Sequence, residues 1–219
     1  MADELDLSIY LVTDPELGGG PDKVADIVAE AVAGGVTVVQ LRDKQATDEQ
    51  VAERARELQA RIDVPLFIDD RLAVAKELGI HLHIGQSDVP YVEARRALPP
   101  HLKIGLSAAS REQVDAVVEQ CAAAQVPLPN LIGIGPVFTT TTKKDAPQAC
   151  GVEHLDDIAR YARSKGIASV AIGGINAQRA PEVAATGVDG LCVVSDIMAA
   201  ADPRAAAAAL VQAWTEVRR

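Results

Sequence analysis

The sequence has few features of a nucleic-acid-binding or membrane protein. Its 219 residues include 21 Lys and Arg against 31 Asp and Glu, so the formal net charge is −10. It contains no block of Lys and Arg, and clustered cations are what a protein needs to bind the phosphate backbone of nucleic acid. No apolar run reaches the roughly 18 residues expected of a membrane-spanning helix. We therefore expect neither nucleic acid nor a membrane as a partner, and any phosphate recognition must be local.

Targeting signals and cysteine motifs are also missing. The acidic start, MADELDLS, lacks the basic segment and apolar core of a secretory signal peptide, so we expect the cytoplasm as the location. Cys121, Cys150 and Cys192 are odd in number and too widely spaced for a zinc site or a disulfide framework. We expect them to be reduced thiols.

Short β-branched runs alternate with amphipathic segments along the whole chain, which is typical of parallel strands joined by helices. We predict strands at residues 8–14, 37–44, 65–70, 81–86, 103–108, 131–138, 169–174 and 190–195. No linker or low-complexity tract divides the chain, so residues 1–219 are predicted to form a single domain. Eight strand and helix units in 219 residues indicate a (β/α)8 TIM barrel, an α/β fold that typically takes about 250 residues.

The predicted helices carry start signals. Thr47 with Gln50, and Ser110 with Gln113, match capping boxes that open the second and fifth helices. The alanine-rich last helix contains Trp214, which we interpret as packing or as a contact in a homo-oligomer. A doubly wound open sheet is the alternative fold, but the G-x-G-x-x-G spacing of dinucleotide-binding sheets is absent after the first strand.

The second strand carries three polar residues on one face. Because side chains alternate with a period of two, Gln40, Arg42 and Lys44 point the same way, opposite to Leu41 and Asp43. In a (β/α)8 barrel the active site lies at the carboxyl ends of the strands, where this ladder would end. A ladder of this kind suits an extended anion, although a solvated strand end with ion pairs to nearby acids would look similar.

Acidic residues follow the third and fourth strands. Asp70 and Asp88 each precede a predicted helix, where the simplest role is an N-cap. The two strands are neighbours in the predicted barrel, however, so the two carboxylates would converge beside Arg42 and Lys44. Mg²⁺ takes one or two carboxylates and fills its coordination shell with substrate and water, so a magnesium site is the alternative.

Glycines and a long polar loop complete the candidate site. Gly173 and Gly174 follow the seventh strand, where they allow close backbone approach to a phosphate or simply form a tight turn. Residues 139–151 form a loop of about a dozen residues, which is long for a barrel connection and thus a candidate lid. Its hydroxyls and Lys143 would donate hydrogen bonds to a phosphorylated substrate, unless the loop is merely solvated.

The histidines do not predict a metal site. His81 and His83 share a strand face but lack a third ligand at a familiar spacing. His101 and His154 fall where surface residues belong.

Motifs in order along nearly the whole chain resemble those of the thiamin phosphate synthase family, namely YLVTD, VQLRDK, DDR, HIGQSD, GLS, GPVFTTTTKKDA, AIGGI and VVSDI. The resemblance implies a (β/α)8 barrel transferase of thiamine biosynthesis. It joins 4-amino-5-hydroxymethyl-2-methylpyrimidine diphosphate to hydroxyethylthiazole phosphate, with Mg²⁺ assistance, and releases pyrophosphate. Such a mechanism builds cationic character on the pyrimidine methylene and needs no protein nucleophile, which agrees with the lack of a convincing catalytic triad.

The resemblance also implies roles for individual residues. Gln40, Arg42 and Lys44 would hold the pyrimidine diphosphate, and Ser107 and Lys143 would serve the same substrate and its leaving group. Of these, Arg42, Lys44, Ser107 and Lys143 are the expected catalytic residues.

The same resemblance implies that Asp70 and Asp88 bind Mg²⁺. The residues implied in binding the thiazole phosphate are Thr140, Thr142, Gly174, Val194 and Ser195.

Two positions depart from the family pattern. The family usually has Asn before the Asp of its NDR motif, whereas this chain has Asp69, which could accept from the aminopyrimidine N–H or join the metal shell. His81 stands where the family has glycine.

Two other functions stay open. A thiazole tautomerase on the same fold is expected to carry His two residues after the Ser of the fifth strand and to lack the metal-binding Asp, whereas this chain has Ala109 and Asp70. A non-catalytic phosphate-binding barrel is the other alternative, and its best support is the departure at Asp69.

Overall fold

A closed barrel of parallel strands forms the centre of the protein. The computed structural model describes residues 5–140 and 148–218. The strands follow one another around the barrel in chain order, and the last pairs with the first, so the predicted (β/α)8 fold is confirmed. The strands are β1 (Ile9–Val12), β2 (Val38–Leu41), β3 (Leu66–Asp69), β4 (His81–Ile84), β5 (Ile104–Ser107), β6 (Leu131–Ile134), β7 (Ala168–Ile172) and β8 (Gly190–Val193).

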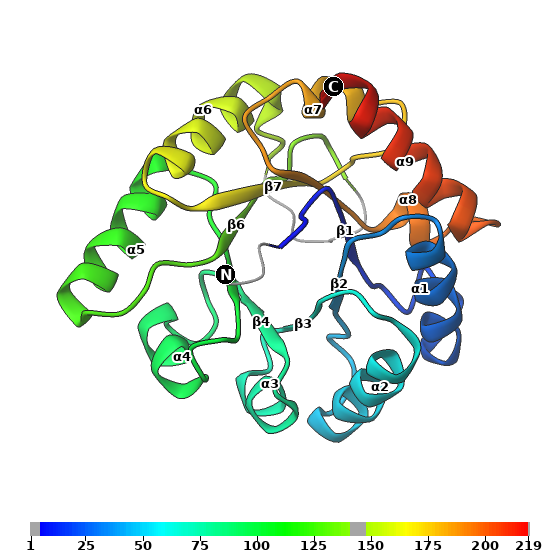
Figure 1. Ribbon diagram of the computed structural model, residues 1–219, viewed down its shortest axis with the longest axis horizontal. Helices are drawn as coiled ribbons and strands as arrows, with labels where there is room; N and C mark the ends of the chain where they lie inside the picture. Colours follow the sequence, from blue (N-terminus) through cyan, green and yellow to red (C-terminus); the bar gives the residue numbers. More distant parts are fainter. Residues whose placement is uncertain (1–4, 141–147, 219) are drawn as a thin grey trace.

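The helices form a ring around the barrel (Figure 1). They are η1 (Pro21–Lys23), α1 (Val24–Ala33), α2 (Asp48–Arg61), α3 (Leu72–Leu78), α4 (Tyr91–Ala97), α5 (Arg111–Ala124), α6 (Gly151–Ser164), α7 (Ala180–Ala184), α8 (Ser195–Met198) and α9 (Pro203–Arg218). The short elements η1 and α8 were not predicted from the sequence. Within the described ranges, none of the helices has the length and apolar character needed to cross a membrane.

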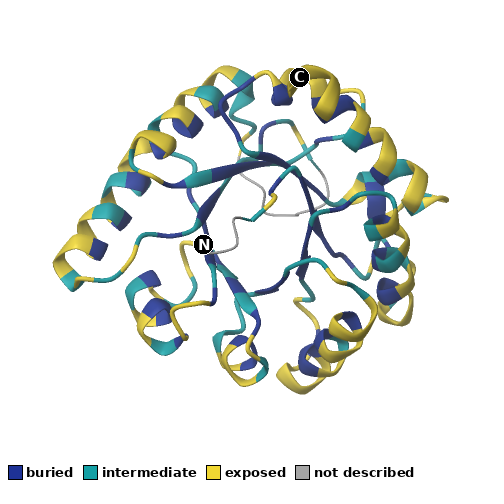
Figure 2. Ribbon diagram, in the orientation of Figure 1, coloured by how far each residue is buried: buried dark blue, intermediate teal, exposed yellow. Residues whose placement is uncertain are grey.

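Two apolar clusters hold the fold together. Outward-facing strand residues such as Leu11 and Ile68 pack against the inner faces of the helices, whose outer faces are exposed (Figure 2). Inward-facing residues such as Tyr10 and Phe67 form a second cluster inside the barrel, which Leu7 joins from the segment before β1. The alternation of strand side chains therefore gives each strand two buried faces, as parallel sheets require.

The strands are shorter than the sequence predicts, because other groups take over the hydrogen bonding at their carboxyl ends. Beyond Leu41, the Arg42 N–H donates to the Thr13 hydroxyl at 2.9 Å, and the same hydroxyl donates to the Arg42 carbonyl at 3.1 Å. β6 stops at Ile134, shortly before Pro136, which has no N–H to donate. The chain thus leaves the sheet early, and its polar residues lie in the loops above the strand ends.

The capping predictions are partly confirmed. Thr47 and Gln50 form a complete capping box at the start of α2. At α5 the Ser110 hydroxyl accepts from Gln113 N–H at 3.3 Å, but the Gln113 side chain accepts from Ala109 N–H instead of closing the box. The second box is therefore only half formed.

The structure gives His81 a packing role. Its ring lies 4.9 Å from that of Phe67 between centroids, and its Nδ1 accepts from Lys103 N–H at 3.1 Å. Burial, assisted by the charge of Lys103, lowers the pKa of His81 to about 4. A neutral imidazole thus packs against Phe67 inside the barrel and holds the start of β5.

Gly190 sets how closely β8 approaches the segment that enters β1. A Cβ atom at Gly190 would lie 1.6 Å from the Leu7 carbonyl oxygen, and backbone cannot move aside as a side chain can. At Gly18, by contrast, a Cβ would lie 3.0 Å from the flexible ends of Ile27 and Met198 and at an ordinary contact distance of 3.6 Å from the Asp14 carbonyl oxygen. The two glycines therefore make a matched pair.

We predict that Gly190→Ala lowers the free energy of unfolding by about 3 kcal/mol, because β8 must separate from β1 to admit a methyl group. Gly18→Ala should change it by less than about 1 kcal/mol. Urea denaturation of both variants measures the difference. Equal stabilities would show that the approach at Gly190 is not a constraint.

Candidate active site

The carboxyl ends of the strands surround a cavity of about 470 Å³. Every predicted site residue within the described part of the chain lines it, whereas Thr142 and Lys143 lie outside the described residues. The predicted residues that line the cavity are Gln40, Arg42, Lys44, Asp69, Asp70, Asp88, Ser107, Thr140, Gly173, Gly174, Val194 and Ser195. The tertiary structure thus brings residues from distant parts of the sequence into one space.

The polar ladder after β2 faces the cavity as predicted. Gln40, Arg42 and Lys44 line the cavity, whereas Asp43 lies on the other side of the chain and pairs with Arg54 of α2. Asp43 also accepts from the backbone of the loop that leads into α2. The alternation therefore continues past the last paired residue of the strand.

A chain of hydrogen bonds fixes the side chain of Gln40. The buried Tyr10 hydroxyl donates to Gln40 Oε1 at 3.0 Å, and Gln40 Nε2 donates to Asp69 Oδ1 at 2.7 Å. Burial raises the pKa of Tyr10 well above its ordinary value, so its hydroxyl stays protonated and can donate. The amide of Gln40 consequently has only one orientation, with its nitrogen toward Asp69.

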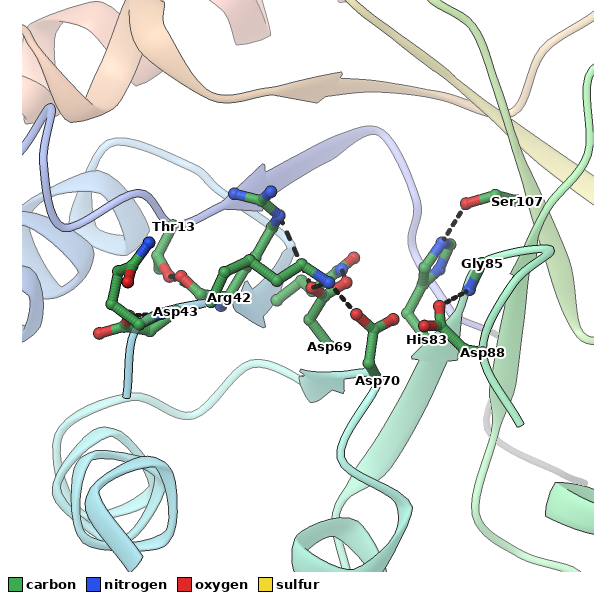
Figure 3. Close-up of polar contacts among 12 residues, drawn as sticks. Thr13, Arg42, Asp43, Asp69, Asp70, His83, Gly85, Asp88 and Ser107 are labelled. Carbon is green, nitrogen blue, oxygen red and sulfur yellow. Dashed lines mark hydrogen bonds and ion pairs between the residues drawn. The ribbon is translucent and has the colours of Figure 1, made fainter. Parts of the chain in front are cut away.

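Asp69 and Asp70 pair with the cations of the ladder (Figure 3). Asp69 Oδ2 lies 3.0 Å from Lys44 Nζ and 3.6 Å from Arg42 Nε, and Lys44 also contacts Asp70. Lys44 is about half exposed, with 48% of its side chain accessible, so these pairs are weak individually. The carboxylates hold both cations at the cavity wall.

Neither Asp70 nor Asp88 caps a helix, so the simpler prediction for them is wrong. The N-cap of α3 is Arg71 and that of α4 is Pro90, and neither end has a side-chain cap. Asp70 has a left-handed backbone, with φ of 61°, and its carboxylate lines the cavity. Asp88 Oδ2 accepts from Gly85 N–H at 2.7 Å, which folds the loop after β4 so that Asp88 also faces the cavity.

The acidic pair has the chemistry of a magnesium site. Asp70 and Asp88 offer carboxylate oxygens from adjacent strands to one cavity, next to the cations that would hold a phosphate. Among residues 5–140 and 148–218, no three His, Cys, Asp or Glu side chains gather as a complete metal site. A pair of carboxylates suits Mg²⁺, which completes its coordination with substrate oxygens and water.

His83 is a cavity residue that the sequence did not reveal. Its Nε2 lies 3.1 Å from Ser107 Oγ, and burial lowers its pKa, although Asp69 and Asp88 oppose that shift. Histidine spacing along the sequence can indicate a metal site but not a contact of this kind. The signal that could have found it is the parallel register, which places His83 beside Asp69 on the inward face.

Across the cavity from the β2 ladder, the backbone of the turn after β7 forms part of the wall. Gly173 and Gly174 have φ of 103° and 66°, and a Cβ at Gly173 would lie 2.5 Å from Pro136. The tight turn alone therefore requires these glycines, and the turn also lines the cavity. An adjoining cavity of about 480 Å³ contains Arg179, which was not predicted; its Nη1 donates to the Gly174 carbonyl at 2.7 Å and its guanidinium lies over Phe138.

Comparisons with known proteins agree with this arrangement. The family model described as thiamine monophosphate synthase matches residues 9–197, which include all of the strands. The chain belongs to the thiamine monophosphate synthase family. The family membership inferred from the sequence motifs is thus confirmed.

Similar proteins in this thiamine monophosphate synthase family include single and multifunctional enzymes. A thiamine-phosphate synthase of Albidiferax ferrireducens is 42% identical over 94% of this chain and 91% of its own length. The multifunctional thiamine biosynthesis protein ThiED of Corynebacterium efficiens is 55% identical over 98% of this chain, but the chain spans only 29% of that protein. The structure of a thiamine phosphate pyrophosphorylase from Pyrococcus furiosus superposes with a TM-score of 0.81 at 33% identity, with 98% of each chain covered.

We predict that Asp69→Asn strengthens the binding of inorganic pyrophosphate about fivefold, or by about 1 kcal/mol, when divalent metal is absent. An amide oxygen can still accept from Gln40, but the substitution removes the charge that pairs with Arg42 and Lys44. Isothermal titration calorimetry measures the affinity. Asp43→Asn, on the other side of the chain, is the control and should leave binding unchanged. Weaker binding by Asp69→Asn would contradict the idea that the Asp69 carboxylate and pyrophosphate compete for Arg42 and Lys44.

Proposed function

We propose that this chain condenses 4-amino-5-hydroxymethyl-2-methylpyrimidine diphosphate with hydroxyethylthiazole phosphate, giving thiamin phosphate and pyrophosphate. The observation that carries the proposal is that Arg42, Lys44, Asp70 and Asp88 all line one cavity. Family membership and the coverage of a single-function synthase over most of its length support it. A cytoplasmic location and a homo-oligomer remain predictions from the sequence.

The ladder on β2 suits the pyrimidine diphosphate. Gln40 is the deepest residue of the ladder, with 4% of its surface accessible. Its fixed amide would hydrogen-bond to the pyrimidine ring or to the oxygen that joins the pyrimidine to the diphosphate. Arg42 and Lys44 follow at successive inward positions toward the cavity mouth, so their charges can spread along the two phosphates. On binding, the diphosphate would replace Asp69 and Asp70 as the partner of these cations.

The acidic pair would hold Mg²⁺. When bound, this ion neutralises charge on the departing pyrophosphate. Asp70 and Asp88 would supply the protein oxygens, while Ser107 and Lys143 would donate to the leaving group. The site thereby favours departure of the diphosphate before the thiazole nitrogen attacks the pyrimidine methylene, and no protein nucleophile is needed.

The opposite wall would bind the thiazole phosphate. Thr140, Gly174 and Ser195 line both the main cavity and its neighbour, so a phosphate at their junction would reach backbone N–H groups and hydroxyls. Val194 lines the main cavity beside them and would contact the thiazole ring. Thr142, which lies outside the described residues, is proposed for the same phosphate from the sequence alone.

Incubation of the purified protein with both substrates and Mg²⁺ tests the function. Release of pyrophosphate together with formation of thiamin phosphate, both prevented by EDTA, is the expected result. Isomerised thiazole without pyrophosphate would indicate a tautomerase. Binding of both substrates without turnover would indicate a phosphate-binding barrel, and either of these results would overturn the proposal.

We predict that Asp70→Ala lowers turnover at least about 100-fold, which corresponds to about 2.7 kcal/mol of transition-state stabilisation. Binding of the thiazole phosphate should change little, because its proposed subsite lies on the opposite wall. Pyrophosphate release and calorimetric titration measure the two effects. Asp63→Ala, at an exposed position before β3, is the control, and an equal loss of both properties in a folded Asp70→Ala protein would contradict the metal role.

A further inference from the structure

His83 occupies a space that Gly105 leaves open inside the barrel. A Cβ atom at Gly105 on β5 would lie 2.6 Å from His83 Nδ1, and one at Gly133 on β6 would lie 3.6 Å from its Cε1. β5 therefore carries no side chain where the imidazole lies, whereas a methyl group at Gly133 would only touch the ring. This vacancy directs the ring from β4 across β5 toward Ser107, and the ring lines the cavity with the proposed substrate-binding groups (Figure 3).

The surroundings of the two ring nitrogens differ. Nε2 lies 3.1 Å from Ser107 Oγ, whereas Nδ1 is buried against β5 and has no hydrogen-bond partner among the described residues. A neutral imidazole carries one N–H, and a buried N–H without an acceptor is rarer in proteins than an acceptor with an unused lone pair. The N–H therefore belongs on Nε2, where the Ser107 oxygen can accept it.

The hydrogen bond from His83 leaves the Ser107 hydroxyl able to donate its own hydrogen. Its oxygen accepts from the imidazole, so its hydrogen is free to turn into the cavity. The backbone of Ser107 is held as well, because its carbonyl accepts from Gln86 Nε2 at 2.5 Å. The hydroxyl is consequently presented as a donor toward the space where a diphosphate oxygen would lie, without needing to reorient when the substrate binds.

We propose that His83 is a positioning residue that orients the Ser107 hydroxyl as a hydrogen-bond donor to the diphosphate. This inference rests on the proposed function. It assigns His83 no proton transfer and no contact with metal. Its effect on the reaction passes entirely through Ser107, which makes the relation between the two residues measurable.

A double-mutant cycle with His83→Leu and Ser107→Ala tests the coupling. His83→Leu should lower kcat about tenfold with little change in KM, because an unoriented hydroxyl still binds substrate but donates less often. In the Ser107→Ala background the same substitution should have no further effect on kcat. His83→Gln, whose amide can donate from nearly the same place, should restore most of the loss.

Additive effects of the two substitutions, or no rescue by Gln, would overturn the proposal. Thermal unfolding of each variant identifies any loss that comes from misfolding. If His83→Leu does not fold, the comparison of His83→Gln with wild type and the spectroscopic measurement below decide the matter. Absence of pyrophosphate release from the wild-type chain would overturn the proposed function and this inference with it, whereas wild-type turnover with additive effects would overturn the role of His83 alone.

Nitrogen NMR of the imidazole provides a readout that does not depend on activity. We expect the wild-type protein to show the neutral tautomer protonated at Nε2 of His83. Ser107→Ala should shift that nitrogen resonance, whereas Gln113→Ala, at another cavity residue, should not. A proton on Nδ1 would mean that Ser107 donates to His83, and it would overturn the proposal.

Discussion

Closure of the parallel strands into a ring constrains everything at this site, because every second side chain is turned into a space that is open only at its ends. The amino-terminal part of this space is filled by apolar side chains such as Tyr10 and Phe67. Gln40, Asp69 and His83 line the cavity at the carboxyl end, and such groups would be unfavourable to bury alone. Hydrogen bonds join Gln40 to Tyr10 and to Asp69, and His83 Nε2 contacts the Ser107 hydroxyl, so these polar groups are held in a fixed arrangement above the apolar side chains.

The sequence was most informative where backbone geometry alone decides the outcome. Strand alternation correctly placed Arg42 and Lys44 on one side of the chain and Asp43 on the other, and the order of parallel strands correctly predicted that Asp70 and Asp88 would line one cavity. Strand ends were predicted too long, since the sequence does not show that a side chain such as that of Thr13 replaces the ladder. His83 was missed for a related reason, because its place in the cavity depends on the room that Gly105 on the neighbouring strand provides.

The electrostatics of the cavity are local and do not follow the charge of the whole molecule. The chain carries a formal net charge of −10, yet the cavity presents cations to an anionic ligand, and each cation already has a carboxylate partner. Affinity for the proposed diphosphate would therefore be a difference between two sets of ion pairs. A site of this kind distinguishes anions by the number and spacing of their charges. A singly charged anion binds less well than a doubly charged one because it cannot replace both carboxylates.

The left-handed backbone of Asp70 has a consequence for how this barrel can be altered. An L-residue in that conformation is less stable than glycine by about 1 kcal/mol, although Asp tolerates it better than most residues do. Glycine at position 70 would relax the turn and remove the carboxylate in a single step. A directed-evolution experiment that screens only for heat resistance would therefore favour variants with glycine at position 70, which are more stable but lack one carboxylate of the acidic pair. A library for such an experiment should keep Asp70 unchanged.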